Sequence, residues 1–484
     1  MEGTSTAPTR ARLGPAFDAA IPIRGARRAP ASAVGLLIAG CGAIAALSLL
    51  LPSALTYDPT AWLIWGREIA HLDLSTTYGP SWKPLPVAVD TLLSVTGGAA
   101  PWLWLLVTRT GGLMALAGCY RLAARLGGWP AGVIAAAALA LSHEWLRDSW
   151  LGNSEGLLLA LIFFAVERHL DGRPKHAVVL GFFAALLRPE VWPFLGLYGI
   201  WLWVREPALR RLSLVLAALI PLLWFVPEAI GSGEPFRAAT RAKAPAPGSN
   251  VPALSEQPVS TLLSNSRHVL IQPALWGGAI ALVLYLWRPW RREWVTFVLG
   301  LWALAWLGVV AAMTGHGYSG NARYLIAPAG LACVAAGVGW ARLGGEISSR
   351  VRLPFVGFAL AAMLLAVSLP WIGPRLHLLH VEGKIAVHES HIDSNIDDAV
   401  ARAGGPDRVR RCGGVYTGPF EVPTVAYQLH RHFSGVALAP RAPGTLFQTR
   451  VTPASPLGPP APKGFRYVGS AGPWRVYTTC VVTP

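Results

Sequence analysis

Charged residues are scarce in this sequence. Only 14% of the 484 residues are Asp, Glu, Lys or Arg, whereas 53% are hydrophobic and 21 are tryptophan. Soluble domains usually carry about 25% charged residues, so this composition excludes a soluble domain for most of the chain. Acidic residues are rarer than basic residues, with 25 Asp and Glu against 41 Lys and Arg. The basic residues form short clusters between apolar runs, which indicates membrane helix ends and not a nucleic-acid-binding surface.

Cysteine is also rare, with five in the whole chain. Cys41, Cys119 and Cys333 lie inside apolar stretches, where a thiol behaves as a small hydrophobic group, and no metal-site spacing is present. Cys412 and Cys480 flank most of the polar C-terminal region. Outside the cytoplasm they can form a disulfide that stabilises this region by about 4 kcal/mol in the chain-entropy model. Two unpaired thiols are the alternative.

Eleven apolar runs reach or approach the roughly 20 residues that a transmembrane helix needs. Basic residues fall in alternate short loops, on the side of the N-terminus, which predicts a cytoplasmic N-terminus. A further run, 84–98, contains Asp90 and would invert every later basic loop if it crossed, so we expect a helix on the outer surface. The eleven predicted spans are 32–54, 101–123, 129–143, 153–170, 175–189, 190–204, 209–230, 269–287, 294–313, 323–341 and 354–372.

The predicted fold class is an α-helical polytopic membrane protein of about eleven spans with a small C-terminal α/β domain. Residues 1–31 form a basic cytoplasmic tail that we expect to be disordered, and residues 32–375 form the transmembrane domain in the cytoplasmic membrane. Residues 376–484 turn polar and are predicted to fold outside the cytoplasm, with a helix near 390–403 and a closing strand in WRVYTTCVV. No internal repeat is visible, so a transporter built from inverted repeats gains no support.

The first outer loop concentrates ionisable side chains at the membrane boundary. Interfacial solvation and snorkelling are the simpler interpretation for several of them. Asp58 is harder to explain in this way, because it directly follows the first predicted helix and lies against the bilayer surface. The ionisable residues of this loop include Asp58, Arg67, Glu68, Asp73 and Lys83.

The order of motifs from Asp58 to about Arg205 resembles the polyprenyl-phosphate-dependent glycosyltransferases of the GT-C class. This superfamily includes protein O-mannosyltransferases, aminoarabinose transferases and actinobacterial arabinosyltransferases. In that class an acidic residue after the first helix precedes an Arg-Glu turn and a Lys-Pro-Pro-Leu element. The counterparts here are Asp58, Arg67-Glu68 and Lys83-Pro84-Leu85-Pro86, with the second proline displaced by one. A later acidic helix start corresponds to Glu155, where the class commonly has Asp.

The resemblance implies a site for the phosphate of a lipid-linked sugar at the outer membrane face. We expect Lys83, Arg109, Arg323 and Tyr324 to bind this donor phosphate. Arg109 lies in an apolar helix, where a charge costs about 2.5–3.5 kcal/mol on insertion scales unless it meets a partner. A structural pair with Asp90 or Glu155 is the alternative for Arg109, and interfacial anchoring is the alternative for Arg323.

Asp58 is the predicted catalytic base. Inverting glycosyl transfer needs one carboxylate to accept the proton of the acceptor hydroxyl while the phosphate leaves from the opposite face. Asp58 and Glu155 together are the candidate ligands of a divalent metal ion. The predicted sugar- or acceptor-binding residues are Trp62, Trp82, Arg67 and His316, for which aromatic-belt packing and ordinary interfacial contacts are the alternatives.

These patterns predict an inverting glycosyltransferase that moves a sugar from a polyprenyl-monophosphate donor to a cell-envelope glycan or glycoprotein outside the cytoplasm. An arabinose or mannose type of sugar is an analogy, based on residue usage typical of a GC-rich genome such as that of an actinobacterium. Two alternatives remain, a carrier or flippase for a lipid-linked glycan and a non-catalytic scaffold of the GT-C type that binds envelope glycan.

Overall fold

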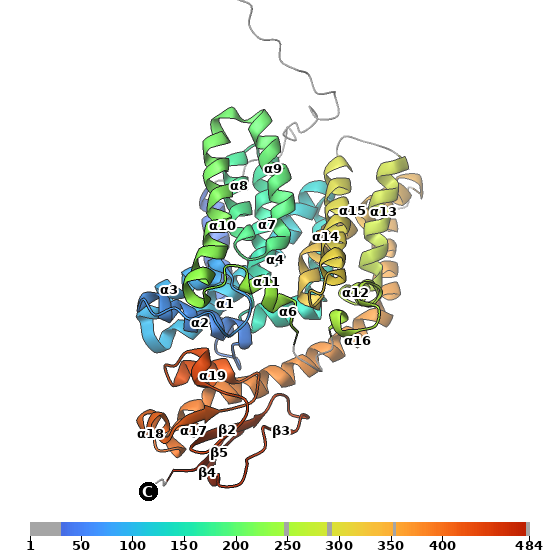
Figure 1. Cartoon of the computed structure of the whole chain (residues 1–484). Helices are drawn as coiled ribbons and strands as arrows, with labels where there is room; N and C mark the ends of the chain where they lie inside the picture. The colour runs from blue at the N-terminus through green and yellow to red at the C-terminus, as the bar shows by residue number, and fades with distance from the viewer. Residues whose placement is uncertain (1–30, 246–250, 288–292, 352–354, 481–484) are drawn as a thin grey trace, which may run out of the picture.

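The computed structural model describes residues 31–245, 251–287, 293–351 and 355–480. The predicted basic tail therefore lies outside the described residues, except for its last position. Figure 1 shows a bundle of upright helices above a smaller unit of helices and strands formed by the C-terminal part of the chain. The two units adjoin at the end of the bundle that carries the long connecting segments.

Each of the eleven predicted spans corresponds to one helix of the bundle. These helices differ in whether they are long enough to cross a membrane. Helices α5 and α8 have only 12 residues each, about 18 Å, against a hydrocarbon core of about 30 Å. The eleven helices are α1 (Ala31–Ser48), α4 (Ala100–Gly127), α5 (Trp129–Ala140), α7 (Glu155–Leu170), α8 (Pro174–Ala185), α9 (Trp192–Arg205), α10 (Arg210–Ser232), α13 (Gln272–Trp287), α14 (Glu293–Gly315), α15 (Ile326–Val351) and α16 (Val356–Ser394).

Length and composition support a multi-pass membrane protein. Within the described ranges, five helical segments are long and apolar enough to cross a membrane. The number is six if α6 (His143–Trp150) and α7, which are bent by 109° at a short break, form one span. Three shorter apolar helices lie in 34–48, 129–140 and 272–287. The predicted number of eleven spans is therefore not confirmed, although every predicted run is helical.

Helix α15 is the central helix of the bundle and is buried along most of its first half. Small residues let its neighbours approach closely, as is common between membrane helices. A Cβ at Gly337 would lie 2.2 Å from the carbonyl oxygen of Ala131 in α5. A Cβ at Gly339 would lie 2.0 Å from the carbonyl oxygen of Gly277 in α13. Side chains at these two glycines would push the helices apart.

The connecting segments at one end of the bundle form short helices of their own (Figure 1). The run 84–98, predicted as a surface helix, is α3 followed by a 3-10 turn in which Gly97 has a φ of 58°. Proline at the first turn of α3 suits a helix start, because that position lacks an intrahelical N–H partner. These helices are α2 (Tyr57–Ala70), α3 (Pro84–Leu93), η1 (Ser94–Ala99), α6 (His143–Trp150), α11 (Arg237–Ala242), η4 (Pro252–Leu254) and α12 (Pro258–Ser266).

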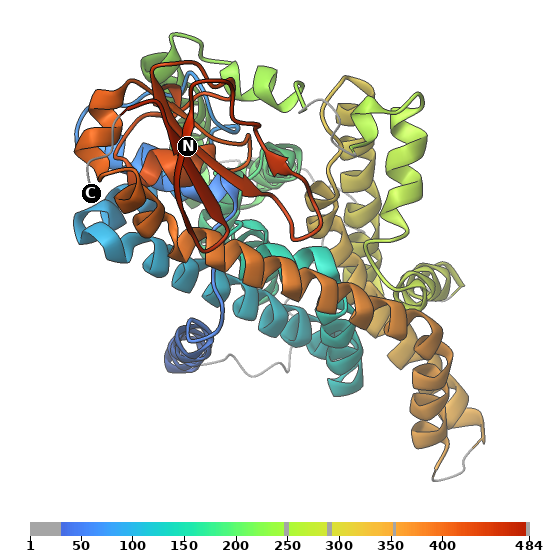
Figure 2. The same ribbon diagram turned by 90° about the horizontal axis from the view of Figure 1, so that it is seen from below.

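Helix α16 connects the bundle to the C-terminal domain without a loop. It has 39 residues, the first half apolar and the second polar, and it contains Pro370 and Pro374. Figure 2 shows it as one long, bent helix running from the bundle to the sheet, and the two prolines account for a bend. The predicted boundary between residues 375 and 376 thus falls inside a helix, and the helix expected near 390–403 is the end of α16 followed by α17 (Ile396–Arg402).

The C-terminal domain is a small mixed sheet with helices, as predicted. The strand order is β1-β2-β5-β4, with β1 parallel to β2 and the other two neighbours antiparallel, and β3 pairs with β2. Burial alternates along β5, where Trp474 and Val476 are buried and Arg475 between them is exposed. The strands are β1 (Gly414–Tyr416), β2 (Gly444–Arg450), β3 (Leu457–Gly458), β4 (Arg466–Ala471) and β5 (Trp474–Thr478), and the remaining helices are α18 (Pro406–Cys412) and α19 (Val422–Gln428).

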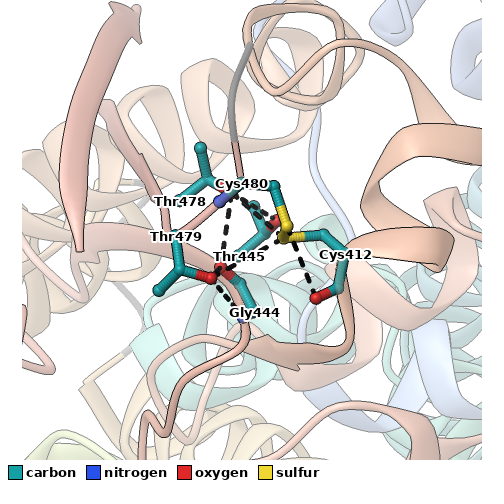
Figure 3. Close-up of a disulfide and its surroundings, with 6 residues drawn as sticks. All are labelled: Cys412, Gly444, Thr445, Thr478, Thr479 and Cys480. Atoms are coloured by element: carbon teal, nitrogen blue, oxygen red, sulfur yellow. Dashed lines mark hydrogen bonds between the residues drawn. A yellow bond between two sulfur atoms is a disulfide. The ribbon is translucent and has the colours of Figure 1, made fainter. Parts of the chain in front are cut away.

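Cys412 and Cys480 form the expected disulfide, shown in Figure 3. It joins the end of α18 to the segment after β5, with Cα atoms 5.9 Å apart and a sequence separation of 68. Beside it, Thr479 Oγ1 accepts a hydrogen bond from the backbone N–H of Gly444 at 2.8 Å. The disulfide therefore joins the end of β5, the last strand of the domain, to α18, the helix that precedes β1.

Cys412→Ser should destabilise the C-terminal domain by about 4 kcal/mol, because a loop of 68 positions is no longer closed in the unfolded chain. Limited proteolysis and amide exchange of β2 and β5 in the full-length protein measure this loss. Cys41→Ala is the matched control, since Cys41 is a free buried thiol in α1. Equal protection in the two variants would show that the disulfide adds no stability.

Candidate active site

Asp58 lies in the first turn of α2, where a carboxylate interacts favourably with the helix N-terminus. Its Oδ2 accepts a hydrogen bond from Arg323 Nη1 at 2.6 Å. Arg323 belongs to the 3-10 turn η5 (Ala322–Leu325) that precedes α15, and its backbone N–H donates to Asn321 Oδ1. The side chains of Asp58 and Arg323 are 14% and 27% exposed, so the pair lies just below the surface.

Lys83 and Glu155 form a second ion pair, which is fully buried. Lys83 precedes α3, and its Nζ donates to Ser154 Oγ at 2.9 Å and lies 3.4 Å from Glu155 Oε1. The ammonium also lies 5.0 Å from the ring centroid of Trp62, a cation–π distance. Burial lowers the pKa of Lys83 to about 8, although the neighbouring carboxylate of Glu155 favours the charged form.

Arg188 is a third buried cation of the site, between α8 and the turn η2 (Pro189–Val191). It contacts Glu155 Oε1 through Nη2, and its Nη1 lies 3.6 Å from Glu190 Oε1. Its guanidinium stacks 4.5 Å from the ring centroid of Tyr324. Arg188 is not among the predicted site residues, and the available signal in the sequence is an arginine directly after an apolar run, in LLRPE.

Several polar atoms around these pairs are buried without a hydrogen-bond partner in the described part of the chain. One carboxylate oxygen each of Asp148, Glu155 and Glu190 is unpartnered, and so is Arg323 Nε. Asp148 lies on α6, 3% exposed, within electrostatic reach of Glu155 and Arg323. Buried polar atoms normally have partners, so this arrangement suits a polar ligand.

The ionic cluster, as we call this site, is built from six separate segments of the chain. The segments bring together three cations and four carboxylates, with Tyr324 beside Arg188. Three predicted phosphate-binding residues and both predicted metal ligands therefore meet in one place. The members of the ionic cluster are Asp58, Lys83, Asp148, Glu155, Arg188, Glu190, Arg323 and Tyr324.

The arrangement does not fit a divalent metal ion well. Within the described ranges, no group of three or more His, Cys, Asp or Glu side chains is placed to hold one. Asp58 is paired with Arg323, and Glu155 with both Lys83 and Arg188. Lys83, Arg188 and Arg323 supply positive charge to the described site.

Arg109 does not join the ionic cluster. Its donors bind the backbone oxygen of Ser48 at 2.8 Å, Ser53 Oγ at 2.8 Å and the backbone oxygen of Trp150 at 3.1 Å. Its guanidinium also lies 3.9 Å from the ring centroid of Trp150. Arg109 thus fastens the end of α1 to α6, which is a structural role, and Asp90 is buried elsewhere without a hydrogen-bond partner among the described atoms.

Trp62 and Trp82 are buried and not arranged as open faces for a sugar. Trp62 is 0% exposed and packs edge-on against Trp104, with ring centroids 5.8 Å apart. Trp82 is 2% exposed, packs against Trp65 and donates from Nε1 to the backbone oxygen of Leu223 at 3.0 Å. Both rings were expected in an outer loop, but the loop folds back as α2 and α3 and buries them.

Arg67 and His316 also lie apart from the ionic cluster. Arg67 donates to the backbone oxygens of Tyr427 at 3.0 Å and Arg431 at 3.3 Å, both in the C-terminal domain. His316 is exposed at the end of α14, where its Nδ1 bonds the backbone oxygen of Ala312 at 2.7 Å. Arg67 therefore contacts the C-terminal domain, and His316 lies on the surface.

No family model and no curated protein sequence matches the chain, whereas solved structures do. ArnT from Cupriavidus metallidurans in the apo state is 14% identical, with a TM-score of 0.54 over 93% of this chain and 98% of that one. ArnT bound to undecaprenyl phosphate is 14% identical, with a TM-score of 0.50 over 93% and 99%. The Archaeoglobus fulgidus oligosaccharyltransferase AglB, in complex with an inhibitory peptide and a dolichol-phosphate, is 12% identical, with a TM-score of 0.50 over 84% and 65%. The chain thus has the fold of the GT-C glycosyltransferases, which confirms the fold expected from the order of its motifs.

Glu155→Gln should lower the stability of the protein, because Lys83 and Arg188 lose their shared carboxylate in a buried place. Removing one partner of a buried ion pair costs about 3–5 kcal/mol, which thermal unfolding in detergent micelles detects. Asp407→Asn is the matched control, since Asp407 pairs with Arg410 and its side chain is 77% exposed. Similar unfolding temperatures for the two variants would contradict the buried pairing.

Proposed function

We propose that this chain is a membrane glycosyltransferase that uses a polyprenyl-phosphate-linked sugar as its donor. The observation that carries the proposal is the ionic cluster, in which a carboxylate lies beside buried cations at one end of a GT-C helical bundle. The solved structure of ArnT with undecaprenyl phosphate supports the same class of lipid ligand. A lipid phosphate needs such a site, because its chain stays in the membrane while its charged head requires cations.

Lys83 and Arg323 are the proposed ligands of the donor phosphate. Lys83 is a buried cation, and Arg323 Nε is a buried donor without a hydrogen-bond partner among the described atoms. A phosphate oxygen can accept hydrogen bonds from both, and charge-assisted bonds of this kind are about twice as strong as neutral ones. Arg188 holds Glu155 and Tyr324 in place behind these two cations.

Asp58 is the proposed catalytic base. The hydroxyl oxygen of the acceptor attacks the anomeric carbon, the bond from that carbon to the phosphate oxygen breaks, and Asp58 accepts the hydroxyl proton. The polyprenyl phosphate leaves with the electron pair, and Lys83 and Arg323 stabilise its developing charge. Phosphate leaves readily, so the reaction needs no separate general acid.

Arg323 connects donor binding to the base. Its guanidinium is bonded to Asp58 at 2.6 Å, which holds the proton-accepting oxygen in an ion pair. A donor phosphate competes for the same guanidinium, and the transfer of Arg323 to the phosphate frees Asp58 to accept a proton. The donor would therefore bind before the base becomes active.

The sugar is proposed to be of the arabinose or mannose type and the acceptor a cell-envelope glycan or glycoprotein. The alternation of basic loops supports a cytoplasmic N-terminus and a C-terminal domain outside the cytoplasmic membrane. The C-terminal domain follows the last long apolar helix directly and adjoins α2, which suits a domain that positions an acceptor beside the ionic cluster. A divalent metal ion has no role in this proposal.

Asp58→Asn should reduce sugar transfer by about 10²–10⁴-fold, the usual contribution of a general base. Transfer is measured as release of polyprenyl monophosphate by the full-length protein, supplied with polyprenyl-phosphate arabinose or mannose and envelope extract as acceptor. Binding of undecaprenyl phosphate should be at least as tight, because Arg323 is no longer held by a carboxylate. A carrier or scaffold would keep its activity in this variant, so unchanged turnover would contradict the transferase proposal.

Donor-phosphate affinity should fall as the pH rises through about 8, because Lys83 loses its proton there and only the ammonium attracts the phosphate. The loss approaches about tenfold per pH unit above that value if the neutral amine does not bind. Titrating undecaprenyl phosphate against the protein between pH 6.5 and 9.5 measures this. Lys83→Arg is the matched control, because an arginine stays charged and should remove the decline. The same decline in both proteins would show that Lys83 is not its source.

A further inference from the structure

The C-terminal domain contacts the first turn of α2, the turn that carries Asp58. The rings of Tyr57 in α2 and Phe433 in the C-terminal domain have centroids 6.1 Å apart. Just before the helix, the backbone N–H of Leu55 donates to Asp393 Oδ2, near the end of α16, at 3.1 Å. The residues on both sides of the turn are therefore held from the C-terminal domain, although Asp58 itself bonds Arg323.

The other end of α2 is held by a histidine bridge. His432 of the C-terminal domain lies with Nδ1 2.6 Å from Glu68 Oε1 and Nε2 3.1 Å from Asp73 Oδ2. Glu68 is buried, with its side chain 5% exposed, and its other oxygen accepts the backbone N–H of Ser75 at 2.9 Å. Asp73 is 74% exposed, and Arg67 adds two bonds to backbone oxygens of the C-terminal domain.

The two carboxylates require the imidazole of His432 to be positively charged. An imidazole between two acceptors donates to both only as the imidazolium, because the neutral ring has one N–H and presents a lone pair to the other carboxylate. Loss of the proton would turn one of the two bonds into a repulsion. The charged or titratable groups that face His432 or its partners are Arg67, Glu68, His71, Asp73, His430 and Arg431.

On its other face α2 packs closely against the membrane domain. A Cβ at Gly66 would lie 2.6 Å from the backbone carbon of Asp90 in α3, so the helix has no room to shift in that direction. The ring of Trp65 packs between Trp82 and Phe433, with centroids 5.5 and 6.0 Å away. Helix α2 is thus held between α3 and the C-terminal domain. A change in its contacts with the C-terminal domain is the one that can displace it.

We propose that protonated His432 is a positioning residue, which locks α2 to the C-terminal domain and so holds Asp58 in place for the reaction. This inference rests on the proposed function of Asp58. It makes the C-terminal domain part of the catalytic apparatus and not only a platform for the acceptor. It also makes sugar transfer depend on pH through a histidine that does not contact the ionic cluster.

The direct test is His432→Gln in the full-length protein. We expect turnover to fall about tenfold, the equivalent of one charge-assisted hydrogen bond, while the affinity for undecaprenyl phosphate stays unchanged. Amides of α2 should exchange faster with solvent, measured by hydrogen–deuterium exchange. His432→Arg should restore turnover, because a guanidinium donates to both carboxylates at every working pH.

The pH profile separates positioning from general stability. Turnover of the wild type should decline with rising pH relative to His432→Arg, whose bridge keeps its charge, because a neutral imidazole can donate to only one of the two carboxylates. Asp73→Asn should weaken the decline with little risk to folding, because Asp73 is largely exposed. His380→Gln, a surface histidine on α16, is the matched control and should keep the wild-type turnover and profile.

The inference is overturned if His432→Gln keeps wild-type turnover, or if His432→Arg is as slow as His432→Gln and shows the same decline with pH. Its failure is distinct from failure of the proposed function. If Asp58→Asn abolishes transfer while every His432 variant is fully active, only the positioning role is wrong. If Asp58→Asn transfers sugar normally, the proposed function itself is wrong.

Discussion

A charge buried beside a membrane costs much free energy unless an opposite charge compensates it, and ion pairs meet this constraint at the end of the bundle that carries Asp58. Asp58 meets Arg323, and Glu155 lies between Lys83 and Arg188. Each pair joins segments that are far apart in the sequence. The pairs therefore fix the relative positions of α2, α3, α7 and η5 through the protein's own side chains.

The same pairing explains how such a site can accept an anion. The three cations of the ionic cluster already have carboxylate partners, so in the proposed mechanism an incoming phosphate does not fill an empty positive pocket. It replaces a carboxylate as the partner of a cation, and the carboxylate that it displaces becomes available as a base. Phosphate binding and activation of the base are then a single exchange of ion-pair partners. The cations cost less free energy to keep in the site, because each always has an anionic partner.

The sequence predicts well those features that depend on local pattern. Each long apolar run became a helix, the polar C-terminal region formed an α/β domain, and Asp58, Lys83 and Glu155 came together as the order of motifs implied. Which partner a side chain meets depends on tertiary packing, which no local sequence pattern records. Arg109 had the charge for a phosphate ligand but bonds backbone oxygens of α1 and α6, whereas Arg188 was missed because nothing local distinguishes it from an interfacial anchor.

Helix α16 shows why the two domains act together. A flexible linker would let the C-terminal domain move freely, but a continuous helix of 39 residues carries the last apolar segment directly into that domain. Near its end Asp393 bonds the backbone N–H of Leu55, and Trp474 of β5 donates to the backbone oxygen of Ile392. The sheet, α16 and the segment before α2 are thus joined by consecutive bonds. A displacement of the C-terminal domain is therefore expected to reach the helix of Asp58 through these bonds.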